Sequence, residues 1–137
     1  MIASTTPANA GSAHRSGKRR VWAGRALSAT AILILLRSAA MKLSAQPDVV
    51  QQVVDGFGYP ASALTGIGLL ELACVLVYAV PRSAVLGAVL LTGYLGGAVA
   101  THVRIEEPFA VPLVLGALVW AGLSLRDERI RNLVRGE

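Results

Sequence analysis

Long apolar segments, each able to cross a lipid bilayer as a helix, are the feature that most constrains this chain. Its 137 residues contain four of them, at about 21–41, 61–80, 83–103 and 109–125. A helix of about 17 to 25 residues spans roughly 30 Å of hydrocarbon. Because that hydrocarbon holds no water, each segment must satisfy its own backbone N–H and C=O groups, which favours helices. The sequence predicts an all-α fold, an integral membrane bundle of four transmembrane helices.

The composition supports a membrane protein. Hydrophobic residues make up 54% of the chain and charged residues 15%, whereas a soluble domain carries about 25% charged residues. The net charge of +5 could suit nucleic acid, but the charges flank oily segments and form no aromatic-basic motif, so we expect no nucleic-acid partner. Cys74 is the single cysteine, which excludes an internal disulfide and a CxxC pair.

The chain before the first span is polar and ends in a basic cluster. Residues 1–20 have too little apolar surface to offset the entropy of ordering, so we expect a disordered basic tail, and residues 21–137 form the membrane domain. The first span is interrupted by Arg25 and Arg37. It also resembles a secretory signal, with a short core and small residues at Ser38 and Ala40. Arg37 directly before the cleavage position argues against that alternative.

A short amphipathic helix is predicted at about 47–56, between the first two spans. Its valines recur at helical spacing and its acidic and amide residues occupy the other side. Pro47 suits the first turn, and Gly56 suits the end. This helix would either lie in the membrane interface or cap the bundle.

Loop charges predict the orientation. Ten basic residues lie at one end of the predicted bundle, whereas Lys42 and Arg104 share the other end with the acidic residues Asp48, Asp55, Glu106 and Glu107. Since basic loops stay inside, we expect a multi-pass protein of the plasma membrane with both termini in the cytoplasm.

Small residues line two sides of the third span. Gly93, Gly96 and Gly97 belong to rows of small residues spaced four apart, a pattern that permits close helix approach. We expect these glycines to pack against helices of the same bundle, with a homodimer seam as the alternative.

Ionisable residues within or beside the spans are the candidate site. Glu71 lies near the middle of the second span, where a charge is costly. It could pair with Arg37 in a structural ion pair, or serve as a ligand or proton site. Lys42, His102 and Arg104 lie at the outer helix ends, where such residues anchor to the interface, yet Lys42, Glu71 and His102 could also converge. With one histidine in the spans, haem or metal is disfavoured.

Six short stretches together resemble the DoxX-like family of small bacterial membrane proteins: SAAMKL at 38–43, GYP at 58–60, GIGLLEL at 66–72, Pro81-Arg82, GGAVATHVR at 96–104 and LRDERIRNL at 125–133. The resemblance implies four transmembrane helices. It also implies a loosely defined activity, since some relatives are linked to quinone-dependent sulfur oxidation or membrane redox complexes. The family's polar positions fall on Ser38, Lys42, Glu71, His102 and Arg104. Ala39 replaces the usual glycine, and Arg37 is an unusual addition.

Three functions follow from these observations. The first is binding of a lipophilic small molecule, such as a quinone, for membrane redox chemistry. The second is a non-catalytic module that assembles with a membrane partner, for example a redox protein. The third is a small proton-coupled transporter using Glu71. No catalytic set is recognisable, so any catalysis would belong to a quinone-linked oxidoreductase of which the chain is a subunit.

Overall fold

Helices make up most of the chain. The computed structural model describes residues 10–136. In chain order its elements are α1 (Ala10–Leu43), α2 (Pro47–Val50), the π-helical segment η1 (Gln51–Gly56), α3 (Ala61–Ala79), α4 (Ala84–Arg104), α5 (Ala110–Arg126) and α6 (Glu128–Arg135). No strand occurs among these described residues. The predicted all-α class is confirmed, including a short helical segment between the first two long helices.

The long helices agree closely with the apolar segments. α3, α4 and α5 each begin and end within one residue of the predicted spans. Three helices are long and apolar enough to cross a membrane: α1 (over Arg15–Leu43), α3 and α4. α5 has 17 residues, a length of about 26 Å at 1.5 Å per residue. These four helices therefore match a helical membrane bundle.

The amino-terminal part of α1 differs from the prediction. Residues 10–20, expected to be disordered, form the first turns of α1, and residues 1–9 lie outside the described part. Extending an existing helix needs no new nucleus, and each added residue gains a hydrogen bond. The Ala, Lys and Arg residues of this stretch are good helix formers, so the membrane helix continues past its apolar part.

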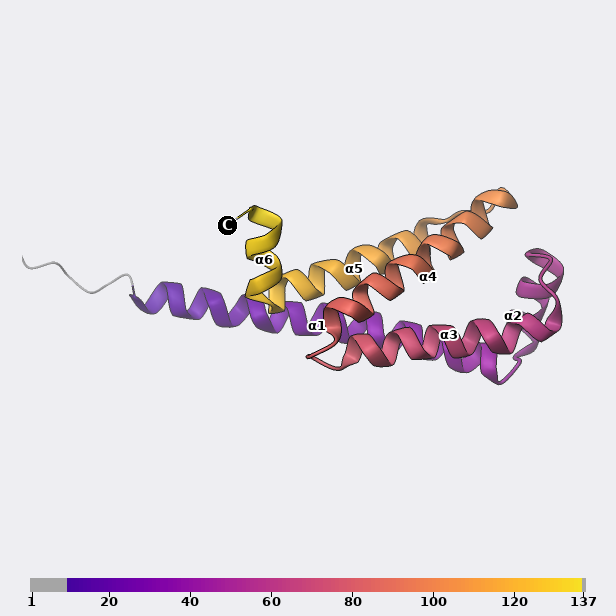
Figure 1. The fold of residues 1–137 in the computed structure, drawn as a ribbon, viewed down its shortest axis with the longest axis horizontal. Coiled ribbons are helices and arrows are strands. Elements are labelled where there is room, and N and C mark those ends of the chain that lie inside the picture. Colours follow the sequence, from indigo (N-terminus) through magenta and orange to yellow (C-terminus); the bar gives the residue numbers. More distant parts are fainter. Residues whose placement is uncertain (1–9, 137) are drawn as a thin grey trace, which may run out of the picture.

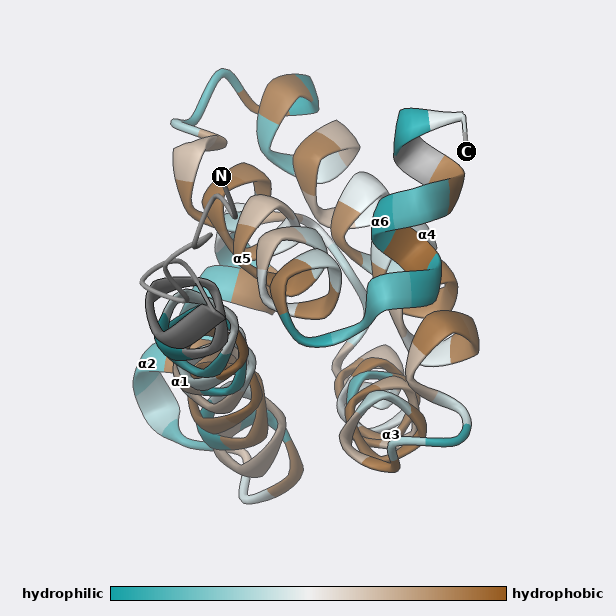
Figure 2. Cartoon of the chain, turned by 90° about the vertical axis from the view of Figure 1, so that its left-hand side faces the viewer, coloured by the Kyte–Doolittle hydropathy of each residue, from teal (hydrophilic) through white to brown (hydrophobic). Residues whose placement is uncertain are grey.

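The four long helices form a ring in which each packs against two others. α1 lies beside α3 and α5, and α4 completes the ring by contacting the same two helices. Figure 2 shows hydrophobic residues over these four helices and hydrophilic ones concentrated on α6 and the connecting turns. Large apolar side chains face outward along the ring, as hydrocarbon requires, among them Leu69, Leu76, Leu86, Val89, Val111 and Leu113.

One end of the ring is closely packed; we call it the basic end, because Arg82 and the arginines of α6 lie there. A Cβ at Gly122 of α5 would lie 2.5 Å from the Ser28 hydroxyl of α1, and one at Gly24 of α1 would lie 2.7 Å from the Arg126 backbone nitrogen. On α4, a Cβ at Gly87 would collide with the backbone of Tyr78. Glycine thus lets backbones approach closely at this end.

Tyr78 joins three helices at the basic end. Its side chain is fully buried, and its hydroxyl donates to the Val119 carbonyl of α5 at 2.8 Å. The Ser28 hydroxyl of α1 lies 2.9 Å from the same oxygen. Because the phenol proton is used by Val119, Ser28 must be the donor to Tyr78. These bonds fix α1, α3 and α5 to one another.

The opposite end is wider, and we call it the capped end. Towards it the α4–α5 pair diverges from the α1–α3 pair, and the segment of α2 and η1 lies at this end (Figure 1). Val53 of η1 is 4% exposed, so the apolar side of this segment is turned into the bundle. This placement agrees with the capping alternative for the amphipathic helix.

Alanine should destabilise the fold at a glycine in close helix contact and should be tolerated at a glycine in open space. Gly87→Ala places a methyl group against the Tyr78 backbone and should destabilise the fold by about 1 to 3 kcal/mol. Gly96→Ala, on the same helix, meets no atom within 4 Å and should be neutral or stabilising by up to about 1 kcal/mol, because alanine favours helix. Thermal unfolding in a mild detergent measures both; equal losses would contradict this packing.

Candidate functional site

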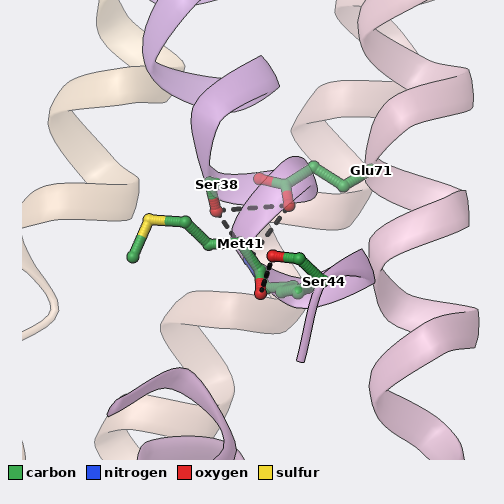
Figure 3. Close-up of polar contacts among 5 residues, drawn as sticks. Ser38, Met41, Ser44 and Glu71 are labelled. Carbon is green, nitrogen blue, oxygen red and sulfur yellow. Dashed lines mark hydrogen bonds and ion pairs between the residues drawn. The ribbon is translucent and has the colours of Figure 1, made fainter. Parts of the chain in front are cut away.

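A buried ion pair connects α1 and α3. The Lys42 Nζ atom lies 2.9 Å from the Glu71 Oε2 atom, and Glu71 is 1% exposed. Lys42 also donates to the Ser38 hydroxyl at 2.6 Å, and that hydroxyl donates to the Glu71 carboxylate at 3.2 Å. Figure 3 shows the Ser38 hydroxyl directed at the Glu71 carboxylate. Three of the sequence-predicted site residues thus form one cluster.

Helix geometry explains why these side chains meet. Ser38 and Lys42 are four residues apart, so they share one face of α1. Helical side chains lean towards the amino terminus of their helix. Because α1 ends at the capped end and α3 begins there, Lys42 leans into the bundle and Glu71 leans out towards it. The two charged groups therefore converge from different depths.

Gly68 makes the approach of the two helices close enough. It lies one turn before Glu71 on α3, and a Cβ there would lie 3.1 Å from the Lys42 Cβ atom and from the Leu43 Cγ atom. A Cβ at this position would require Lys42 or Leu43 to shift by a few tenths of an ångström. Sequence reasoning missed Gly68, although its spacing of three from Glu71 places it on the same face of α3.

The proposed Arg37–Glu71 pair is wrong. Glu71 pairs with Lys42 instead, and within residues 10–136 no carboxylate lies in ion-pairing range of Arg37. The reason is rotation about the helix axis: one residue before Ser38, Arg37 lies about 100° around α1 from the face that meets α3. Its side chain is exposed and lines a cavity instead.

A cavity of about 720 Å³ occupies the space between the diverging helix pairs, beneath the cap. All four long helices and the cap contribute to its wall. Most of the wall is apolar, with Leu35, Ile67, Leu70, Leu95 and Leu115 among the lining residues. Its ionisable and hydroxyl lining groups are Arg37, Ser38, Lys42, Tyr59, Glu71, Tyr94, Thr101 and His102. Apolar walls with a few polar groups are typical of small-molecule sites.

Tyr94 of α4 lines the same cavity as Glu71, and sequence reasoning missed it. Tyr94 lies ten residues before the end of α4, and Glu71 ten residues after the start of α3. In antiparallel neighbours these positions share a depth of about 15 Å below the capped end. The equal distances of Tyr94 and Glu71 from the capped end of their helices could have identified Tyr94 from the sequence.

His102 lies nearer the capped end, on the wall of the same cavity. Its Nδ1 atom lies 2.8 Å from the Ala98 carbonyl oxygen, so this nitrogen carries a proton, because a carbonyl only accepts. The ring of Phe57 packs edge-on against the His102 ring, with centroids 5.0 Å apart. His102 thus joins the cavity wall to the cap.

Arg104 fastens the cap and is absent from the described cavity wall. Its guanidinium donates to the Phe57 carbonyl and lies over the Tyr59 ring at 5.7 Å from the centroid. The Tyr59 hydroxyl in turn lies 2.9 Å from the Thr101 hydroxyl of α4. These contacts tie the segment after η1 to the end of α4. Arg104 therefore holds the cap in place over the cavity.

The expected packing role of Gly93, Gly96 and Gly97 is also wrong. A Cβ at any of the three would meet no atom within 4 Å. Gly93 and Gly97 line the cavity, and Gly96 is exposed on the outside of α4. The cause is the divergence of α4–α5 from α1–α3, which separates the helices at this depth. Close packing instead occurs at Gly87, about two to three turns nearer the basic end.

The described residues also bear on metal chemistry. Among residues 10–136, no group of three His, Cys, Asp or Glu side chains is placed to hold a metal ion. Cys74 is free and buried on α3.

Removing one partner of the buried pair should cost more than removing both. Lys42→Met leaves Glu71 without its counter-charge, which should destabilise the fold by about 3 to 5 kcal/mol, whereas the double variant Lys42→Met with Glu71→Leu should recover much of that loss. Thermal unfolding of the full double-mutant cycle measures the coupling. The matched cycle of Arg37→Met with Glu71→Leu should be additive; coupling in that cycle alone would contradict the assignment.

Comparison with known proteins gives one family match, and its range includes the whole site. A family model described as the DoxX-like family matches residues 26–122, a range that includes most of α1, the cap, α3, α4 and most of α5. No curated protein and no solved structure gives a match. Since the matched range exceeds half of the chain and contains the ion pair and the cavity wall, this membrane protein belongs to the DoxX-like family.

Proposed function

We propose that the protein binds a lipophilic small molecule in the cavity beneath the cap. The observation that carries this proposal is the cavity itself, about 720 Å³ in volume, with apolar walls and a polar cluster at mid-depth. Sites of roughly 300 to 1,000 Å³ with this lining suit small organic ligands. The polar groups of the wall would orient the polar head of such a molecule, and the leucines would contact its chain.

A quinone is one candidate for the ligand. Its carbonyl oxygens accept hydrogen bonds, and Lys42, Tyr94 and Ser38 supply donors around the cavity. In that case the chain would hold the quinone, and electrons would come from a membrane redox partner. We assign no catalytic step to the chain's own residues, so its part in a quinone-linked oxidoreductase would be that of a binding subunit.

Neighbouring glycines on α4 provide the test. Gly97→Leu adds a side chain inside the cavity, whereas Gly96→Leu adds the same side chain on the outside of the helix. Lipophiles extracted from gently purified wild-type protein and both variants are identified by mass spectrometry. We expect about one small molecule per chain in wild type and in Gly96→Leu, and its loss in Gly97→Leu, since the leucine occupies ligand volume. Only bulk phospholipid in all three would refute the proposal.

Assembly with a protein partner is the second candidate, and a specific observation favours it. Gly96 and Ala100 are exposed on the outside of α4, four residues apart. Small residues at this spacing allow another helix to approach closely in a membrane. A partner helix on this face would leave the cavity free, so both functions are compatible in one complex.

We further propose a plasma-membrane location with both termini in the cytoplasm. The support is charge: Arg82, Arg126 and the basic residues of α6 and early α1 flank the basic end. The capped end carries two basic residues, Lys42 and Arg104, beside four acidic ones. Short loops rich in Lys and Arg remain on the cytoplasmic side.

Reporter fusions check this orientation. Green fluorescent protein fused after Arg135 should fluoresce, and alkaline phosphatase fused there should be inactive, because that enzyme folds only outside the cytoplasm. The same phosphatase inserted after Glu107, at the capped end, should be active. The reverse pattern would place the cap and its cavity on the cytoplasmic side.

A further inference from the structure

Arg37 is a cation within the apolar part of α1, and the described structure gives it no counter-charge. It lies six residues before the end of α1, about 9 Å inside the capped end. Its side chain lines the cavity, and no carboxylate of residues 10–136 lies in ion-pairing range. Charged groups at such depth are costly unless they face a partner or a polar cavity.

The remaining charges of the cavity wall do not compensate Arg37. Lys42 and Glu71 neutralise each other at 2.9 Å, and the other lining side chains include no further carboxylate. The wall therefore carries a net positive charge. A neutral ligand would leave this cation without a counter-charge, whereas an anionic ligand would balance it.

We propose that the ligand of this cavity is an amphiphile with an anionic headgroup, a carboxylate or a phosphate, that pairs with Arg37. The inference rests on the binding function proposed above and specifies its ligand class. A guanidinium offers a planar fork of N–H donors that matches both anions. Gln52 of the cap lines the same cavity and adds an amide donor. The alkyl chain would lie along the leucines of the wall.

Binding measurements with matched probes test the headgroup. Palmitic acid, hexadecyl phosphate, hexadecanol and a decyl-substituted benzoquinone are titrated against full-length protein in a neutral maltoside detergent. We expect the two anionic probes to bind at least about tenfold more tightly than the alcohol or the quinone, as a desolvated ion pair would give. Inorganic phosphate should not compete, because it lacks the chain that the apolar wall would hold.

Variants locate the effect. Arg37→Gln should remove the preference for the anionic probes while leaving alcohol binding unchanged, and Arg37→Lys should retain part of it. Arg25→Gln is the matched control: Arg25 is also exposed on α1 but stacks over Trp22 at 5.8 Å and does not line the cavity. Gly97→Leu should remove binding of every probe.

Four outcomes would overturn the inference. If the quinone or the alcohol binds as tightly as the acid and Gly97→Leu removes both, the cavity binds lipophiles but does not select an anion, and the proposed function survives. If no probe binds, the proposed function fails as well. If Gly97→Leu keeps the preference for anionic probes, and added anionic phospholipid displaces those probes, Arg37 contacts membrane lipid outside the cavity. If free phosphate competes fully, the site takes an inorganic anion.

Discussion

Burial of the Glu71 carboxylate is the constraint on which the capped half of the bundle depends. Glu71 is the one acidic residue within the four long helices, and a carboxylate there must be neutralised or paired. Lys42 supplies the counter-charge, which fixes the rotation of α1 against α3, and Gly68 lies at their close contact. That rotation places Arg37 about 100° away from the side of α1 that meets α3, where it is exposed and lines the cavity.

The cavity exists because the two ends of the bundle use small residues differently. At the basic end, Gly24, Gly87 and Gly122 bring backbones close, and Tyr78 bonds three helices together. Helices held tightly at one end and crossing at an angle must separate at the other. The cap of α2 and η1 covers that separation, and Arg104 holds it in place. Tight packing and open space are therefore two results of one helix arrangement.

The polar groups of the cavity follow an order of depth that suits an amphiphile lying along the membrane normal. His102 and the cap lie near the surface, Arg37 and Ser38 lie deeper, and the carboxylate of Glu71 lies with Tyr94 at about 15 Å. A headgroup near the surface would meet cations first, while its chain would follow the leucines inward. The cluster of Ser38, Lys42 and Glu71 lies at the inner end of the cavity and joins α1 to α3 independently of any ligand.

The sequence by itself determined the all-α fold, the positions of the long helices to within a residue for three of them, the amphipathic segment and most of the polar residues at the site, because hydrophobic periodicity and charge are local properties. Only the tertiary structure decided which cation pairs with Glu71 and which glycines pack. Both depend on helix rotation and crossing, and a single row of small residues or one charged position is compatible with several rotations. The small stripe at Gly93, Gly96 and Gly97 faces open space for that reason, and Lys42 takes the place expected of Arg37.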